Sequence, residues 1–151
     1  MYEFLLAIHI LCAVIWVGGG VSVHVLGRWT QKRGDPDQIV AFNRDAMKIW
    51  NVFYAPLAII LLVAGVLLIE EVGYSYGDLW ITLGFMGWLV SLVLALGFYA
   101  GQGRKVEVAV SAGGPAAPEA QARIRRILLV NSIEILILLL VVIDMAVKPG
   151  A

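Results

Sequence analysis

The sequence has few charged residues and a single cysteine, and both shortages exclude classes of protein. Of its 151 residues only 15% are charged and 61% are hydrophobic, whereas a soluble domain has about a quarter charged and about half apolar residues. The net charge is zero and no basic stretch with interleaved aromatic residues occurs, so we expect no nucleic-acid partner. Cys12 has no cysteine to pair with, so it says nothing about the redox compartment.

The first apolar stretch lacks the features of a cleaved signal peptide. Residues 1–3 carry one acid and no Lys or Arg, and the apolar stretch continues to about Leu26. It is therefore longer than the hydrophobic region of a signal peptide, and no A-x-A-like cleavage site follows it. We expect this stretch to be retained as a membrane span.

Long apolar segments are what the sequence has in abundance. About 20 apolar residues cross the roughly 30 Å of hydrocarbon in a bilayer as a helix. Unpaired backbone is costly in lipid, and the segments lack the alternation of barrel strands, so we expect helices. The predicted fold is all-α, a polytopic membrane four-helix bundle forming a single transmembrane domain over residues 1–151. Its spans are predicted at residues 2–26, 52–69, 79–100 and 127–147.

The connections between the spans carry charge asymmetrically. Ten of the eleven Lys and Arg residues fall between spans 1 and 2 or between spans 3 and 4. The connection between spans 2 and 3 has Glu70, Glu71 and Asp78 but no cation, and the C-terminal flank has only Lys148. The positive-inside rule therefore predicts an N-out/C-out protein of the cell (inner or plasma) membrane, with both basic connections in the cytoplasm.

Both basic connections contain segments with a predicted structure. Asp35-Pro36-Asp37 favours a helix start, followed either by a short amphipathic helix in the lipid headgroups or by an N-terminal extension of span 2. Residues 101–122 are predicted to form a flexible cytoplasmic linker, because stretch 111–118 is rich in Gly, Ala and Pro. The aromatic residues near the span ends are expected to anchor the protein at the membrane interfaces: Trp29, Trp50, Tyr54, Tyr74, Tyr76 and Trp80.

Ionisable residues inside the spans are the candidates for function, because a charge in lipid is costly. His9 and His24 lie in span 1, and Glu134 and Asp144 lie in span 4. A rise of about 1.5 Å per residue places them in two tiers, His9 with Asp144 and His24 with Asn131 and Glu134. An imidazole–carboxylate pair in either tier would satisfy both groups. Spans 1 and 4 thus carry the candidate chemistry, and spans 2 and 3 are predicted to be scaffold.

One face of span 1 presents His9, Trp16 and Gly20, since Trp16 and Gly20 each lie within about 20° of His9 around the helix. The glycines leave room either for a neighbouring helix or for a flat ligand. His9 is either a cofactor or metal ligand, or a structural histidine bonded to Asp144 or to a backbone carbonyl. His9 and His24 lie about 22 Å apart along one helix, so they cannot ligate one haem together. A single-histidine haem, a Met or Lys sixth ligand, and a haem shared across a homodimer remain open.

Span 1 reads LLAIHILCAVIWVGG over residues 5–19, and its His-Ile pair and Trp-x-Gly-Gly turn carry a resemblance. This helix resembles the first helix of the CopD copper-resistance domain, of the HemJ-type protoporphyrinogen oxidases, and of a bacterial group known only as predicted integral membrane proteins. Four spans in a chain of this length, with a basic first loop, are most similar to the last group. HemJ-type enzymes bind haem b, so the resemblance implies that His9 is a candidate ligand of haem iron or another metal. Spans 2 and 3 depart from the HemJ pattern, because they contain no second histidine.

The sequence leads to two main hypotheses of different classes. The first is a haem- or metal-associated redox membrane protein, with His9 as ligand and Trp16 and Gly20 beside the cofactor. The second is a non-catalytic accessory or assembly subunit of a larger membrane complex, whose glycine faces bind partner helices. A proton-coupled carrier that uses Glu134 is a third. We expect the lipid bilayer and a homo-oligomer or larger membrane complex as partners, and no catalytic residue is identified, because no nucleophile has a base near it.

Overall fold

The computed structural model describes residues 1–149, in which long helices are joined by short turns and no strand occurs. Two π-helical segments, η1 and η2, continue the helices on either side of them. The elements are α1 (Tyr2–Arg33), α2 (Pro36–Ile49), η1 (Trp50–Tyr54), α3 (Ala55–Val72), α4 (Leu79–Val93), η2 (Leu94–Tyr99), α5 (Ala100–Gly113) and α6 (Pro118–Val147). Taken with η1 and η2, they give four helices that are long and apolar enough to cross a membrane, which confirms the all-α polytopic fold.

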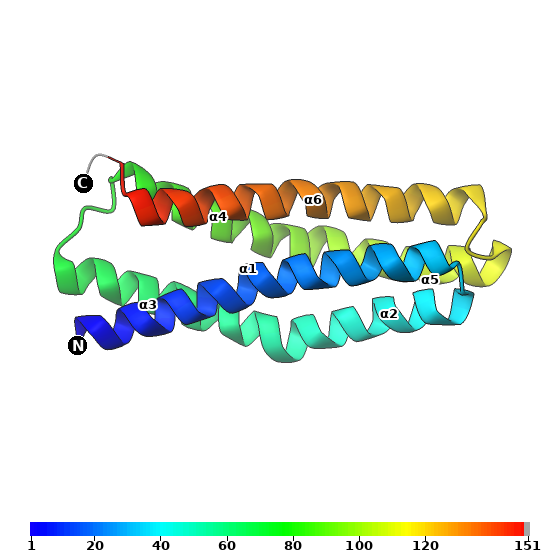
Figure 1. Cartoon of the computed structure of the whole chain (residues 1–151), viewed down its shortest axis with the longest axis horizontal. Helices are drawn as coiled ribbons and strands as arrows, with labels where there is room; N and C mark the ends of the chain where they lie inside the picture. Colours follow the sequence, from blue (N-terminus) through cyan, green and yellow to red (C-terminus); the bar gives the residue numbers. More distant parts are fainter. Residues whose placement is uncertain (150–151) are drawn as a thin grey trace.

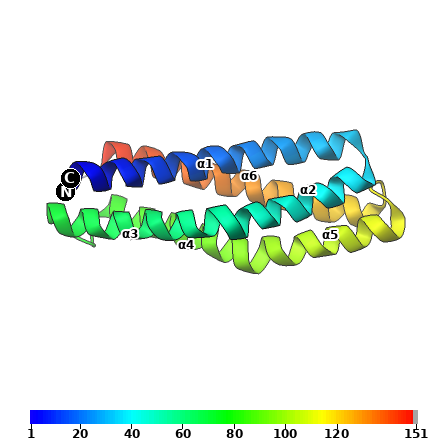
Figure 2. The same cartoon turned by 90° about the horizontal axis from the view of Figure 1, so that it is seen from below.

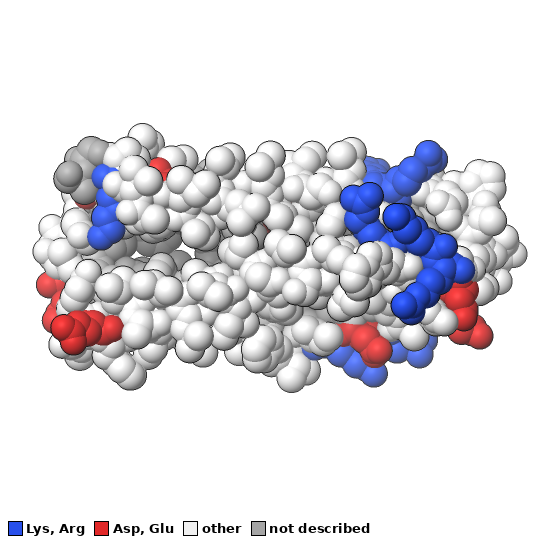
Figure 3. Space-filling model, viewed as in Figure 1, with Lys and Arg blue, Asp and Glu red and all other residues white. Residues whose placement is uncertain are grey.

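The four long helices run side by side along the long axis of the molecule (Figures 1 and 2). α1 begins and α6 ends at the same end of the bundle, where the turn after α3 also lies. We call this the terminal end. The turns after α1 and α5 lie at the opposite end, where Lys and Arg side chains gather (Figure 3), and we call this the basic end. Towards the terminal end α1 packs against α3 and α4 packs against α6, while α1 and α6 also contact each other.

Every helix extends beyond its predicted span at the basic end. α1 has 32 residues and is about 48 Å long at 1.5 Å per residue, which exceeds the roughly 30 Å of bilayer hydrocarbon. The prediction of a linker over residues 101–122 is wrong for most of its length, because α5 continues to Gly113 and α6 begins at Pro118. Only residues 114–117 lie between these two helices.

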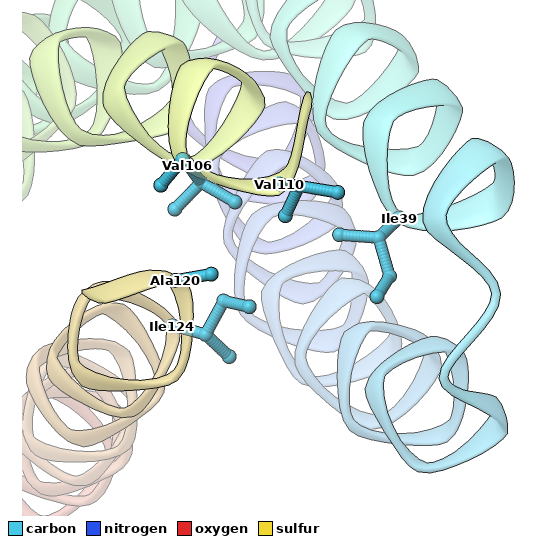
Figure 4. Close-up of a cluster of buried hydrophobic side chains, with 6 residues drawn as sticks. Ile39, Val106, Val110, Ala120 and Ile124 are labelled. Carbon is cyan, nitrogen blue, oxygen red and sulfur yellow. The ribbon is translucent and has the colours of Figure 1, made fainter. Parts of the chain in front are cut away.

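The packing at the basic end explains these extensions. Ile39 of α2 and Val106 of α5 have no exposed surface, and they cluster with Val110, Ala120 and Ile124 (Figure 4). The cluster draws side chains from three helices, so each segment buries its apolar face only if the others are helical too. Burial of this kind outweighs the weak helix propensity of the glycines at either end of α5.

The segment before α3 is an amphipathic helix that also extends the second span towards the basic end. α2 is amphipathic, with Ile39 buried and charged residues exposed, and it is also continuous with α3 through η1. η1 lies just before Pro56, which lacks an N–H and whose ring clashes with the carbonyl four residues earlier. A local π turn is one way in which a membrane helix accommodates a proline.

Candidate functional site

Two cavities lie between the helices, one above the other along the bundle. The first, which we call the His9 cavity, has a volume of about 660 Å³ and is bounded by α1, α3, α4 and α6 towards the terminal end. Figure 3 shows the surface hollowed at this level. The second, the Glu134 cavity, has about 190 Å³ and lies nearer the basic end. Trp16, Val17 and Leu138 line both cavities and form the partition between them.

The imidazole of His9 is held against α3 by a backbone carbonyl. His9 Nδ1 lies 3.1 Å from the oxygen of Leu61, and since a carbonyl only accepts, Nδ1 carries the proton and donates it. The lone pair of Nε2 then has no hydrogen-bond partner among residues 1–149. His9 lines the larger cavity, so this lone pair is the one basic group that its ring can offer to a ligand there.

A pair between His9 and Asp144 is not present in the described chain. The partner of His9 lies on α3 instead, and Asp144 Oδ2 is buried without a hydrogen-bond partner among the described residues. The rise per residue gives the depth of two side chains but not the direction in which each points around its helix. Of the alternatives for a structural histidine, the structure shows the bond to a backbone carbonyl.

The His9 cavity has aromatic walls and one cation near the terminal end. Lys148 Nζ donates to the hydroxyl of Tyr74 at 3.1 Å, and it lies 5.0 Å from the ring centroid of Tyr74 and 5.2 Å from that of Trp80. Met145 also lines this cavity. Tyr74 and Trp80 therefore face the inside of the bundle, and the prediction that they anchor at the membrane surface is wrong for Trp80, which is only 7% exposed.

The Glu134 cavity contains the second tier of polar residues. Glu134 is 8% exposed, and the Tyr99 hydroxyl donates to its Oε2 at 2.6 Å. His24 does not contact Glu134 by a hydrogen bond; its Nδ1 donates to Oδ1 of Asn131 at 2.8 Å. The sequence correctly predicted that His24, Asn131 and Glu134 lie at a similar depth. It missed Tyr99, which lies in span 3, a span that was predicted to be scaffold.

Both π segments end in a tyrosine that lines the Glu134 cavity, Tyr54 in η1 and Tyr99 in η2. A Cβ at Gly19 would overlap the Tyr54 hydroxyl, so glycine at this position lets the tyrosine reach α1. π segments are rare and occur frequently at functional sites. The signal that could have identified Tyr99 is its depth, since it lies near the same end of the membrane segment as Glu134.

The structure does not bring His9, Trp16 and Gly20 into one site. Trp16 is 6% exposed and lines both cavities, whereas Gly20 lines only the Glu134 cavity. The physical reason is length, because 11 residues of helix separate Gly20 from His9 by about 16 Å. The same face of α1 therefore lines the His9 cavity and, further along the helix, the Glu134 cavity.

Several glycines serve helix packing, as one of the two sequence interpretations proposed. A Cβ at Gly87 would lie 2.8 Å from Val141 Cγ2, and a Cβ at Gly84 would overlap the Met145 methyl group. These two glycines allow α4 and α6 to approach closely. Gly65 has a different role, because the ring of His9 occupies the space where its side chain would be.

Comparison with known proteins identifies the family. A family model described as predicted integral membrane protein (DUF2269) matches residues 3–149. The chain belongs to this family. The resemblance to predicted integral membrane proteins is thereby confirmed, while the resemblance to the CopD domain and to HemJ-type oxidases is not. No curated protein and no solved structure matches the chain.

The donor set limits which metal this family member is able to hold. No group of three or more His, Cys, Asp or Glu side chains that could hold a metal ion occurs within residues 1–149. A bare ion would find too few protein ligands beside His9. Haem iron already has four nitrogen ligands in its macrocycle, so one histidine is sufficient to attach it.

Proposed function

We propose that this integral membrane protein binds haem b in the His9 cavity, where His9 would hold the iron, and that it takes part in one-electron transfer. The hydrogen bond from His9 Nδ1 to the Leu61 carbonyl carries the proposal. Metal-ligating histidines almost always donate the second ring N–H to a carbonyl, a carboxylate or water, which fixes the tautomer and the ring orientation. The same bond prepares Nε2 as the ligating atom.

The size and lining of the cavity support a flat apolar cofactor. Its volume of about 660 Å³ lies within the range of roughly 300–1,000 Å³ that is usual for ligand and cofactor pockets. Lys148 provides a positive charge near the terminal end that suits a carboxylate substituent. Bound haem would supply the one-electron chemistry, with Met145 and Lys148 among the other side chains that line its cavity.

The absorption spectrum of the full chain, purified in mild detergent from haem-replete cells, tests the proposal. We expect a Soret band, and a reduced-minus-oxidised difference spectrum typical of a b-type haem. A colourless, metal-free preparation from such cells would sink the proposal.

Variants of the two histidines test the ligand assignment. We expect His9→Ala to lose the Soret band, because the iron loses its ligand. His24→Ala is the matched control and should keep the band, because His24 is bonded to Asn131 in the other cavity. Circular dichroism should show equal helix content in both. A band that survives His9→Ala would remove His9 as the ligand.

We also propose that the basic end faces the cytoplasm and that both termini face outward, in the inner or plasma membrane. Ten of the eleven Lys and Arg residues lie in the two connections at the basic end, and the positive-inside rule assigns such connections to the cytoplasm. In a Cys12→Ala background, Ser75→Cys should react in intact cells with a membrane-impermeant maleimide, and Ser111→Cys only after lysis. Both serines are exposed, one at each end of the bundle. The reverse labelling pattern would contradict the orientation.

The alternative function is that of a non-catalytic accessory or assembly subunit. Gly97 and Gly101 favour it, because they are exposed one helical turn apart and a Cβ on either would meet nothing within 4 Å. In this alternative, Gly97→Ile should release the chain from its membrane complex without loss of helix content. An unchanged complex would argue against the glycine pair as the contact.

A further inference from the structure

We propose that the Glu134 cavity is a proton-exchange site, in which the Glu134 carboxyl takes up and releases a proton through water that enters from the basic end. The proposal does not depend on haem binding, because Glu134 and His9 line different cavities. In each exchange the O–H bond of the carboxyl breaks, the electron pair stays on the oxygen, and a cavity water accepts the proton. The reverse step reloads the carboxyl.

The partners of Glu134 give the first argument. Its carboxyl is nearly buried, and the Tyr99 hydroxyl is the only hydrogen-bond donor to it among the described residues. A carboxylate has about four acceptor sites, so Oε1 is left for water. No Lys or Arg side chain of the described chain lines the cavity, so no fixed cation compensates an ionised Glu134. A proton or hydronium ion is the positive charge that such a cavity can supply.

The cavity itself gives the second argument. At roughly 30 Å³ of liquid per molecule, its volume of about 190 Å³ corresponds to about six water molecules. A buried water needs two to four polar partners, and the cavity offers side chains of that kind on five elements: His24, Asn43, Tyr54, Tyr99, Asn131 and Glu134. The His9 cavity, by contrast, is lined almost wholly by apolar side chains.

The direction of access follows from the lining at either end. Trp16 and Leu138 lie between the Glu134 cavity and the largely apolar His9 cavity. Towards the basic end it is lined by Asn43 and Met47 of α2 and by Gly103 of α5. These helices lie beyond the predicted spans, where water is the solvent. The exchange path therefore leads to the basic end and stops at the partition.

The remaining titratable groups of the cavity have separate roles. His24 of α1 is bonded to Asn131, and Tyr54 of η1 reaches across to Gly19. Tyr99 of η2 donates a hydrogen bond to Glu134, so it is a positioning residue that holds the carboxyl towards the cavity. The two π segments thus each place a tyrosine in the lining of the cavity that holds the exchanging group.

Infrared difference spectroscopy of the full chain in liposomes tests the proposal. We expect the C=O stretching band of a protonated carboxyl to grow as the pH of the buffer is lowered. The band should disappear in Glu134→Gln, which keeps an acceptor for Tyr99, and remain in Asp144→Asn. The Tyr99→Phe variant should keep the band but shift it to higher frequency, because the carboxyl loses a hydrogen bond.

A cavity-filling variant tests the path. Gly20 lines the cavity, and a Cβ there would meet nothing within 4 Å, so Gly20→Leu fills the space that water occupies. We expect the carboxyl band to shift more slowly after transfer to D₂O in Gly20→Leu than in the parent chain. Gly101→Leu is the matched control, since Gly101 lines neither cavity and a Cβ there would also meet nothing within 4 Å. A titrating band that persists in Glu134→Gln, no titrating band, or equal exchange in both leucine variants would overturn the proposal.

Discussion

The ring of His9 reaches a carbonyl of α3 because residue 65 is glycine. Leu61 and Gly65 are one helical turn apart, so the Leu61 oxygen already accepts the Gly65 N–H within α3. A second donor can approach this oxygen only where no side chain covers it. A Cβ at Gly65 would lie 3.0 Å from His9 Cε1 and 3.3 Å from Nδ1, so a single methyl group decides whether the histidine is oriented.

The Gly65→Ala variant should therefore displace His9 from its carbonyl. Relative to the Gly101→Ala control, which gains the same helix propensity, we expect a loss of about 1 kcal/mol in the free energy of unfolding, the usual net value of one hydrogen bond, measured in detergent micelles. If haem is bound, its Soret band should also shift or weaken. Gly101→Ala is the control, because Gly101 is helical and lines neither cavity, and its Cβ would meet nothing within 4 Å. Equal stability of the two variants would show that the His9 bond contributes nothing.

Tyr76, in the turn after α3, predicts a pH effect outside the membrane. Its hydroxyl donates to Glu70 Oε1 at 2.6 Å, and this hydrogen bond, with burial and the Glu70 charge, raises the pKa of Tyr76 above its ordinary value of 10.0. Because the folded pKa lies above the unfolded one, the stabilisation is complete below pH 10 and is lost as the pH rises through the folded value. Glu70→Gln should lower the pKa of Tyr76, measured by NMR of ring-labelled tyrosine with Tyr76→Phe for assignment. An unchanged titration would contradict the coupling.

Among the elements, α2 is the one whose start is most clearly encoded. Asp35 accepts from the backbone N–H groups of Asp37 at 3.0 Å and Gln38 at 3.3 Å, and from the Gln38 side chain at 2.9 Å. Pro36 occupies the first helical position, where no N–H is needed. This cap lets α1 and α2 reverse direction within two residues, and so places Ile39 against α5 and α6.

The Asp35→Ala variant should lose this cap. We expect it to lower the free energy of unfolding by about 1 kcal/mol, within the range of 0.5–2 kcal/mol for such substitutions. Asp37→Ala removes a charge from the same turn without removing a capping bond, so it serves as the comparison. Denaturation followed by circular dichroism measures both. Equal losses would assign the effect to helix-dipole electrostatics rather than to the cap.

At the scale of the whole molecule, the helical bundle has two differently packed parts. At the basic end, apolar side chains are buried among α2, α5 and α6. Elsewhere large apolar residues point outward, among them Val14 at 64%, Ile59 at 60% and Val93 at 60% exposed. Lipid solvates such side chains, so helices in the membrane need not bury them against one another. The membrane part can therefore keep two cavities that a soluble core of this size would fill.

Paired isoleucine variants test this division. Ile39→Ala removes a fully buried side chain and should cost about 2–5 kcal/mol of unfolding free energy. Ile59→Ala, in a position 60% exposed towards lipid, should stay within about 0.5 kcal/mol of the parent chain. The measurement is reversible unfolding in lipid bicelles. A comparable loss at both positions would show that the basic end is no tighter than the membrane part.

The sequence by itself determined the class of the molecule and the depth of its polar residues. Long apolar runs can only be helices in lipid, and a constant rise per residue fixes how deep each side chain lies. Four spans, the two tiers and the gathering of basic residues at one end therefore follow from counting. The loop-like composition of stretch 111–118 led to a linker that was predicted too long. Residue propensities describe only the local sequence, whereas Val106 and Val110 are buried against helices that are distant in the sequence.

Only the tertiary structure decided which residues meet. His9 points to Leu61 and not to Asp144, and Glu134 meets Tyr99 and not His24. These partners depend on the rotation of each helix about its axis. Packing at Gly65, Gly84 and Gly87 and the wider i→i+5 turns of the π segments set this rotation together. A single sequence gives the depth of each residue along its helix, but it does not give the rotation of the neighbouring helices about their axes. That rotation depends on the packing of all four helices at once.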